Sequence, residues 1–354
     1  MRIVSIVGAR PNFVKTAPVI AALRRRLPGE RHALVHTGQH YDRMMSDVFL
    51  SDLNLPDPDY FLGVGSESHA VQTARVMERL EPVLREERPD LVIVPGDVNS
   101  TLAATLVAAK LQIPIAHLES GLRSFDRTMP EEINRIVADE FSEYLLLHSD
   151  EAVQNLRHEG IPDERMHFVG NTMIDSLMAV ERHFREAHAA ERLGMTPGDY
   201  LLVTLHRPAL VDGPLLVDVV QRLGEVAEEL PVVFPVHPRT WSRMKALELP
   251  PGIRVTDPLG YLDFLSLESE ATAVLTDSGG VQEETTFLRV PCFTLRDNTE
   301  RPVTVRLGTN IVLGLAPNAI VEVIPRLEKF DPGKVTIPPR WDGRAAERVV
   351  EVLA

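Results

Sequence analysis

The sequence predicts an α/β protein with two parallel-sheet domains, and three observations support this fold class. Short, continuously apolar runs alternate with segments of helical periodicity, which is typical of a parallel sheet covered by helices on both faces. This alternation occurs twice, once in each half of the chain. Glycines and polar side chains follow the apolar runs, at the ends of strands where such sheets bind ligands. We therefore predict two Rossmann-like domains that face each other across a cleft.

The first half of the chain contains four apolar runs that we interpret as strands, with helical patterns between them. The expected strands are residues 3–7, 33–37, 91–94 and 115–118, and the expected helices are residues 15–26, 69–87 and 101–111. Pro18 falls in the first turn of the first of these helices, where proline is tolerated. We assign residues 1–169 to an N-terminal domain.

The second half repeats the pattern. Its expected strands are residues 201–205, 232–236, 273–276 and 291–295, and its expected helices are residues 215–228 and 280–288. A further helix, at about residues 171–188, is expected to follow the crossing between the domains. We assign residues 170–343 to a C-terminal domain. The last helix, residues 344–354, follows a rigid proline-rich turn, and we expect it to pack back on the N-terminal domain.

Charge and composition exclude several classes of function. The 354 residues carry 37 Lys and Arg against 51 Asp and Glu, a net charge of −14, which disfavours nucleic acid and anionic membranes as partners. No apolar run approaches the ~20 residues that span a bilayer, and the N-terminal residues do not resemble a signal peptide. The single cysteine, Cys292, excludes an intrachain disulfide. We expect a cytoplasmic protein in which Cys292 is an inert core thiol.

The stretch LTDSGGVQEE, residues 275–284, predicts an anion-binding turn. An apolar strand ends at Asp277, and Ser278, Gly279 and Gly280 then open a helix. Unpaired N–H groups and the helix dipole favour an anion there, and glycines let a phosphate approach the backbone. One turn later, Glu283 or Glu284 can accept hydrogen bonds from a ribose diol. The alternative is a helix that Ser278 merely caps, with a solvated acidic face, and these residues alone do not decide between the two.

Cations follow other predicted strands. Arg10 and Lys15 lie in a glycine turn after the first strand, and the alternative to anion binding is that both are solvated side chains near a helix start. His206 and Arg207 follow the predicted strand at residues 201–205. His237 follows the predicted strand at residues 232–236. Together with the serine–glycine turn, cations at strand ends are typical of a diphosphate pocket.

Carboxylate side chains lie in or directly after three consecutive loops in the first half of the chain. Asp97 and Glu119 each end a predicted strand, and Glu131 and Glu132 fall in the first turn of a helix. Crowded carboxylates shift one another's pKa, which suits them to general acid and base roles. Helix capping is the alternative for Glu131 and Glu132, and binding of a hard cation is the alternative for the whole set. No cysteine cluster is present, and we predict neither a metal nor a cofactor.

Taken together, these motifs resemble the non-hydrolysing UDP-N-acetylglucosamine 2-epimerases of bacteria. The resemblance covers essentially the whole chain, and its motifs combine into a specific signature. In order they are GARPNFVKTAP, TGQH, PGDVNST, HLESGLRS, PEEINR, GNTMID, LHRP, PVHP, LTDSGGVQEE, RDNTERP and WDG.

The resemblance implies a glycosyltransferase-B-like fold, with the nucleotide held by the C-terminal domain and the sugar facing the N-terminal one. It implies reversible C2 epimerisation of UDP-N-acetylglucosamine to UDP-N-acetylmannosamine, through elimination of UDP to 2-acetamidoglucal and re-addition. It also implies a cytoplasmic homodimer that binds a UDP-sugar and no nucleic acid or membrane.

By the same resemblance, individual residues take roles. The implied catalytic residues are Asp97, Glu119, Glu131 and His206. The implied substrate contacts are Arg10, Lys15, Arg135, His237, Ser278, Gly279, Gly280, Glu284 and Arg301, with Glu284 on the ribose and the serine–glycine turn on the diphosphate.

Two positions depart from the family pattern and leave the sugar specificity open. Many members have Glu where this chain has Asn12, and His-Arg-Arg-Glu where it has His206-Arg-Pro-Ala209. A UDP-diacetamido-uronic acid is therefore an alternative substrate. Three further functions stay open at this point: a hydrolysing 2-epimerase, a UDP-sugar glycosyltransferase and a non-catalytic UDP-sugar sensor.

Overall fold

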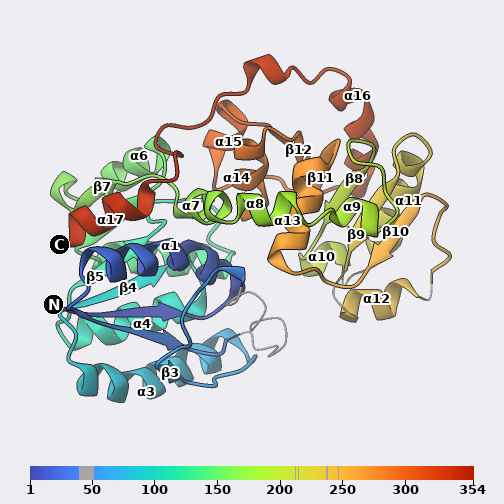
Figure 1. Cartoon of the computed structure of the whole chain (residues 1–354). Helices are drawn as coiled ribbons and strands as arrows, with labels where there is room; N and C mark the ends of the chain where they lie inside the picture. Colours follow the sequence, from blue (N-terminus) through green and yellow to red (C-terminus); the bar gives the residue numbers. More distant parts are fainter. Residues whose placement is uncertain (40–51, 212, 214, 237, 246) are drawn as a thin grey trace. The chain divides into compact units, whose positions relative to one another are not determined.

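A computed structural model describes residues 1–39, 52–211, 213, 215–236, 238–245 and 247–354 (Figure 1). The chain divides into two compact units. The first contains Met1–Ala179 together with Pro339–Ala354, and the second contains Val180–Pro338.

The first unit is built on a parallel sheet whose described strands number seven, in the order β3-β2-β1-β4-β5-β6-β7. They are β1 (Arg2–Val7), β2 (Arg31–His36), β3 (Tyr60–Phe61), β4 (Leu91–Pro95), β5 (Ile115–Leu118), β6 (Tyr144–Leu147) and β7 (Met166–Phe168). The helices of this unit are α1 (Arg10–Arg26), α3 (His69–Glu87), α4 (Asn99–Lys110), α5 (Pro130–Phe141), α6 (Asp150–His158), α7 (Thr172–Ala179) and α17 (Ala345–Leu353).

The second unit has a parallel sheet whose described strands number six, in the order β10-β9-β8-β11-β12-β13. They are β8 (Leu201–Thr204), β9 (Val232–Pro235), β10 (Ile253–Thr256), β11 (Ala273–Thr276), β12 (Cys292–Thr294) and β13 (Asn310–Val312). Its helices are α8 (Glu181–Arg185), α9 (Ala189–Arg192), α10 (Pro208–Val211), α11 (Leu215–Ala227), α12 (Pro238–Met244), α13 (Tyr261–Glu270), α14 (Gly279–Leu288), α15 (Pro302–Arg306) and α16 (Val323–Leu327).

These two sheets confirm the predicted fold class of two Rossmann-like parallel-sheet domains. All eight predicted strands are present, and they include the central strands of both sheets. The strands that the sequence analysis did not identify are β3, β6, β7, β10 and β13. Four of these five, β3, β7, β10 and β13, are edge strands, where partial burial removes the continuous apolar run that marks a central strand.

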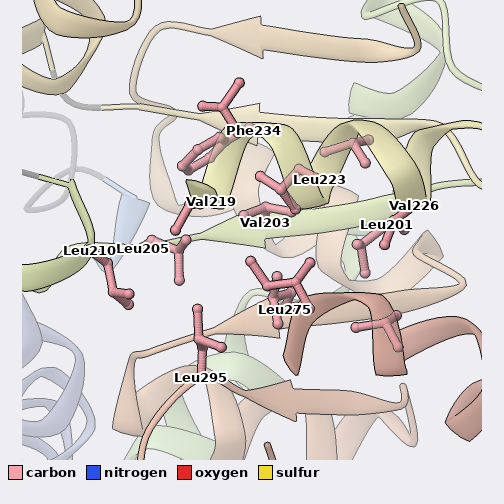
Figure 2. Close-up of a cluster of buried hydrophobic side chains, with 14 of the residues drawn as sticks. Leu201, Val203, Leu205, Leu210, Val219, Leu223, Val226, Phe234, Leu275 and Leu295 are labelled. Atoms are coloured by element: carbon pink, nitrogen blue, oxygen red, sulfur yellow. The ribbon is translucent and has the colours of Figure 1, made fainter. Parts of the chain in front are cut away.

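The core of the second unit shows why its strands are continuously apolar (Figure 2). Val219, Leu223 and Val226 recur at helical spacing along α11, and all are buried in one cluster with Val203 of β8 and Phe234 of β9. A strand covered on both faces must be apolar at successive residues. Cys292 lies in β12 of the same unit, and burial raises the pKa of its thiol to about 12. Cys292 is therefore an inert core thiol, as predicted.

The prediction of one helix at residues 171–188 was wrong. The structure has two helices there, α7 and α8, and the chain passes from the first unit to the second at Val180. Leu177 of α7 is buried in the first unit, and Phe184 of α8 is buried in the second. The two helices are buried in two different cores. The chain therefore does not continue from α7 to α8 as one helix. Within the described residues, no helix is both long and apolar enough to cross a membrane.

The C-terminal segment belongs to the first unit. Asp175 of α7 accepts hydrogen bonds from the backbone N–H groups of Ala345 (3.2 Å) and Ala346 (2.7 Å) at the start of α17. Burial raises the pKa of Asp175 to about 6. Trp341 is fully buried and donates its indole N–H to the His148 carbonyl over 3.0 Å. These contacts also explain why the first unit extends to Ala179 and starts again at Pro339, rather than at the predicted 169 and 344.

We expect Gly170→Ala to destabilise the first unit strongly. Gly170 has a φ of +97°, and a β-carbon there would lie 2.1 Å from the Arg340 carbonyl oxygen. Left-handed strain alone costs about 1–2 kcal/mol, and a clash with backbone adds to it. Chemical denaturation followed by circular dichroism measures the loss. Gly160→Ala is the matched control, because Gly160 has a φ of +81° but nothing within 4 Å. Equal losses in the two variants would contradict this prediction.

Candidate active site

Four of the predicted site residues follow strands beside the topological switch points of the two sheets. The first sheet reverses its strand order between β1 and β4, and the second reverses between β8 and β11. In open parallel sheets, ligands bind at the carboxyl ends of the strands beside such a reversal. Arg10 follows β1, Asp97 follows β4, His206 follows β8 and Ser278 follows β11. The fold therefore gives each unit a binding edge.

Asp97 is held by Arg135, a residue that the sequence analysis assigned to substrate binding. Arg135 donates from Nε (3.0 Å) and Nη2 (2.8 Å) to the same oxygen, Oδ2. Asn134 donates to the Asp97 carbonyl over 2.8 Å. The Asp97 side chain is 22% exposed, and no hydrogen bond from the described residues reaches its Oδ1. The carboxylate is thus fixed in orientation with one oxygen available to a substrate.

Glu119 lies beside the same turn. A β-carbon on Gly96 would lie 3.5 Å from Glu119 Oε2 and 3.0 Å from Lys15 Nζ. Lys15 and Glu119 form a buried ion pair. Glu119 has a φ of +65°, a conformation that costs about 1–2 kcal/mol for a residue other than glycine. Its backbone N–H donates to the Leu146 carbonyl over 3.1 Å. The strained backbone and the ion pair direct this carboxylate to the Gly96–Asp97 turn.

The two acidic residues at the start of α5 have different surroundings. Glu132 is buried, accepts from Ser124 N (2.9 Å) and Phe125 N (2.8 Å), and pairs with Arg135 Nη1 over 2.6 Å. Glu132 therefore holds the preceding loop and has no oxygen to spare for a substrate. Glu131 is half-buried and lies one helical turn before Arg135, on the same face of α5. This placement brings Glu131 to the side of α5 that holds Asp97.

The glycine turn after β1 is joined to β4 by Asn12. Its Oδ1 accepts from Gly8 N (3.0 Å) and Ala9 N (3.2 Å), and its Nδ2 donates to the Pro95 carbonyl over 3.3 Å. Arg10 is the first residue of α1 and is half-buried. Asn12 therefore fixes the turn that carries Arg10, a role that a longer Glu side chain would perform with a different geometry.

Ser278 does not cap α14 with its side chain, so the capping alternative is wrong. Ser278 occupies the N-cap position of α14, but its hydroxyl makes no capping hydrogen bond. Its N–H donates instead to Thr276 Oγ1 over 2.9 Å, and its carbonyl accepts from Gln282 Nε2 over 3.2 Å. The first N–H groups of α14 and the Ser278 hydroxyl thus remain for an anion.

Asp277 joins this turn to the His206 loop. Its carboxylate accepts from the backbone N–H groups of His206 (2.9 Å) and Arg207 (2.7 Å). Burial alone would raise the pKa of Asp277, but these bonds and the His206 ring lower it below its usual range. The His206 side chain is 68% exposed. Asp277 is thus an ionised anchor, and the His206 imidazole extends from it into solvent.

Arg301 lies against the serine–glycine turn. A β-carbon on Gly279 would lie 2.2 Å from Arg301 Nη1, so the guanidinium group occupies the space that this glycine leaves. Arg301 is 7% exposed, and its Nε lies 3.2 Å from Glu283 Oε2. The structure therefore brings Ser278, Gly279 and Arg301 together within one unit, as an anion site requires.

Glu284 is buried at the same helix. Tyr261 donates its hydroxyl to Glu284 Oε1 over 3.0 Å. Burial, together with the charge of Glu283, raises the pKa of Glu284 to about 8. Glu268 of α13 is fully buried, and neither of its carboxyl oxygens has a hydrogen-bond partner among the described residues. Burial and the charge of Glu284 raise the pKa of Glu268 well above its usual range. Both carboxyl groups favour the neutral form.

We expect Glu268→Gln to make stability less dependent on pH. A carboxyl group with a raised pKa binds more protons in the folded state than in the unfolded state, so stability falls as pH rises above about 4.5. Glu284 adds to this loss up to about pH 8. Thermal melting should show little effect of Glu268→Gln at pH 5 and a higher midpoint than wild type at pH 8.5. Exposed Glu229→Gln is the control, and a constant difference at both pH values would contradict the assignment.

His237 lies outside the described residues. Several residues that shape the site were not identified from the sequence: Asn134, Asp139, His117, Asp277 and Gln282 act through long-range hydrogen bonds, which leave no local pattern in the chain. In the sequence, these residues were marked only by their position inside or beside motifs that were identified through other residues.

A family model described as UDP-N-acetylglucosamine 2-epimerase matches residues 23–354. A UDP-N-acetylglucosamine 2-epimerase of Methanocaldococcus jannaschii is 41% identical, over 100% of this chain and 99% of the relative. A UDP-2,3-diacetamido-2,3-dideoxy-D-glucuronate 2-epimerase of Pseudomonas aeruginosa is 42% identical, over 100% of this chain and 99% of the relative.

The solved structures give the same result for the fold. The crystal structure of the Methanocaldococcus jannaschii UDP-GlcNAc 2-epimerase, in complex with UDP-GlcNAc and UDP, matches this chain with a TM-score of 0.92 and 40% identity. The match covers 100% of this chain and 99% of that one.

Proposed function

The chain belongs to the UDP-N-acetylglucosamine 2-epimerase family, and from this premise we propose that it interconverts UDP-N-acetylglucosamine and UDP-N-acetylmannosamine without net hydrolysis. The observation that carries the proposal is the pair of carboxylates at the Gly96–Asp97 turn. Asp97 is held through one oxygen by Arg135 and keeps the other oxygen available, and Glu119 Oε2 lies at the same turn.

The chemistry explains why several carboxylates are needed. The C2 proton of the sugar is only weakly acidic, so its removal is coupled to cleavage of the C1–O bond. One carboxylate takes the proton while UDP leaves with the bonding electrons, which gives 2-acetamidoglucal. A carboxylic acid then returns a proton to the opposite face of C2 as UDP adds back to C1. Asp97, Glu119 and Glu131 are the candidates for the acid and base roles.

The second unit supplies the leaving-group contacts in this proposal. The N–H groups at the start of α14, the Ser278 hydroxyl and Arg301 bind the diphosphate, and their positive potential stabilises the charge that develops as UDP departs. His206, which follows β8 of the same unit, contributes a further donor group. The buried Glu284 accepts from the ribose hydroxyls, and a diol that donates to it favours the ionised form.

A time course followed by ¹H NMR tests this function. With UDP-N-acetylglucosamine as substrate, we expect UDP-N-acetylmannosamine to accumulate until a constant ratio is reached, with no stoichiometric release of UDP. Prompt appearance of UDP and free N-acetylmannosamine would assign the chain to the hydrolysing type instead. Binding of the substrate without any turnover would favour a sensor, and transfer of the sugar to an added acceptor would favour a glycosyltransferase.

A UDP-diacetamido-uronic acid is the second candidate substrate. The Pseudomonas relative that acts on such a sugar by its name is as similar to this chain as the Methanocaldococcus enzyme. Comparison of kcat/KM for the two UDP-sugars decides between them. The homodimer and the cytoplasmic location remain predictions, which size-exclusion chromatography with light scattering and cell fractionation would test.

A further inference from the structure

His117, on β5 of the first unit, has a partner at each of its ring nitrogens. Its side chain is fully buried. Nε2 lies 2.7 Å from the Gly96 carbonyl oxygen, and Nδ1 lies 2.7 Å from Asp139 Oδ1. A carbonyl oxygen only accepts hydrogen bonds, so Nε2 must carry a proton.

Asp139 determines the proton on the other nitrogen. Its Oδ2 lies 2.7 Å from Arg123 Nη1 and accepts from the Gly121 N–H over 3.1 Å. Burial would raise the pKa of Asp139, but the charges and hydrogen bonds of His117 and Arg123 lower it below its usual range. An ionised carboxylate only accepts, so Nδ1 must also carry a proton. Both ring nitrogens therefore face acceptors, and only the imidazolium form donates a hydrogen bond to each of them.

The charged groups nearest this ring come from α5 and from the loop after β5. Asp139 belongs to α5. Arg123 lies in the loop after β5 and also forms a two-bond pair with Glu159, at 2.7 and 2.6 Å. The two candidate catalytic carboxylates are close in the chain, because Asp97 follows Gly96 and Glu119 lies two residues after His117. Glu119 is itself paired with Lys15.

We propose that His117 is a positioning residue, a buried imidazolium ion that fixes the Gly96–Asp97 turn to α5 and thereby orients the Asp97 carboxylate. This proposal rests on the proposed function of Asp97. The His117 bond to the Gly96 carbonyl sets the plane of the peptide that precedes Asp97. The same helix, α5, holds the Asp97 carboxylate through Arg135 and holds His117 through Asp139, one turn further on.

Gly96 explains why a fixed peptide is needed here. Its φ of +62° lets the chain turn sharply at the end of β4, and glycine imposes little conformational restraint of its own. The Gly96 N–H donates to the Leu118 carbonyl over 2.9 Å, next to His117. Without the imidazolium, the Gly96 carbonyl would lose its 2.7 Å hydrogen bond to His117, and a displacement of about 1 Å can lower a rate by about 100-fold.

The first test uses His117→Asn in the full chain, because Asn can donate to only one of the two partners. We expect kcat for UDP-N-acetylglucosamine to fall about 100-fold, with KM and the affinity for UDP nearly unchanged. His158→Asn, on the exposed face of α6, is the matched control. Wild-type kcat in a folded His117→Asn protein would overturn the proposal.

A second variant covers the case in which His117→Asn does not fold. Asp139→Asn keeps the size and an acceptor atom but removes the charge that the imidazolium requires. We expect the same loss in kcat with the same KM, and no further loss when the two substitutions are combined in a folded protein. Full activity of Asp139→Asn would contradict the role of the charged pair.

Two measurements need no substrate and separate this inference from the function itself. In ¹⁵N-histidine-labelled wild type, both ring nitrogens of His117 should carry a proton, and that signal should be missing in His117→Asn. Backbone amide exchange at Gly96 and Asp97 should be at least about tenfold faster in His117→Asn than in His158→Asn. A neutral ring, or unchanged exchange, would overturn the proposal even if the enzyme is active. If the wild type does not epimerise, the proposed function fails, and these two measurements still decide the role of His117.

Discussion

Asp97→Asn is expected to lower the epimerisation rate by roughly 10³-fold, within the range that general acid–base groups contribute. The amide has the same shape as the carboxylate and can still accept from Arg135 through its oxygen, so the turn is preserved. It cannot take or return a proton at C2. The rate is measured by ¹H NMR of the two UDP-sugars, and the affinity for UDP by isothermal titration calorimetry.

The affinity for UDP should be nearly unchanged in this variant, because the diphosphate contacts are proposed to lie in the second unit. Asp163→Asn is the matched control, since Asp163 is exposed and pairs only with Arg157 among the described residues. An Asp97→Asn protein that retains the wild-type rate would remove Asp97 from the mechanism. A large loss of UDP affinity would instead assign Asp97 to nucleotide binding.

Gly279→Ala is expected to weaken UDP binding by about 100-fold, or about 2.7 kcal/mol. The backbone of Gly279 does not have a positive φ, so alanine causes no strain of that kind. Its β-carbon would lie 2.2 Å from Nη1 and 2.6 Å from Cζ of Arg301. Either the guanidinium group is displaced from the turn or the turn itself shifts, and both disrupt the diphosphate site. Titration calorimetry with UDP measures the effect.

A control variant must show whether the loss of UDP affinity arises at the Gly279 turn or from any replacement of glycine by alanine. Gly29→Ala serves this purpose, because a β-carbon at Gly29 would have nothing within 4 Å. Epimerisation by Gly279→Ala should be restored in part at saturating substrate. If Gly279→Ala folds and binds UDP with wild-type affinity, the start of α14 is not the diphosphate site.

The sequence predicted the central strands and the strand-end loops because their signals are local. A continuous apolar run that ends in a glycine-containing turn marks the end of a buried strand. Residues 91–96 and 273–279 show this pattern. The short strand β7, with only half-buried residues, has no such signal. The break at Val180 was missed for a related reason, because the two cores that bury α7 and α8 are not visible in a helical pattern.

The strand-end positions of the candidate site residues were predictable from the sequence, but the partners of these residues were not. Arg135 was assigned to the substrate, whereas the structure pairs it with Asp97 and Glu132. Glu131 and Glu132 look equivalent in the sequence, but only Glu132 is used to hold the neighbouring loop. The bond from His117 to Asp139 joins residues that are 22 positions apart. Such contacts depend on how α5 packs against the sheet, and periodicity carries no information about that packing.

The central claim, that the C2–H bond is broken and reformed on this chain, is tested most directly by exchange with solvent. UDP-N-acetylglucosamine is incubated with the protein in deuterated water, and the two UDP-sugars are followed by ¹H NMR and mass spectrometry. We expect every newly formed UDP-N-acetylmannosamine to carry one deuterium at C2, and the returned UDP-N-acetylglucosamine to gain deuterium as the reaction reaches equilibrium. Formation of UDP-N-acetylmannosamine that retains the original hydrogen at C2 would contradict proton removal and return by the Asp97, Glu119 and Glu131 carboxylates.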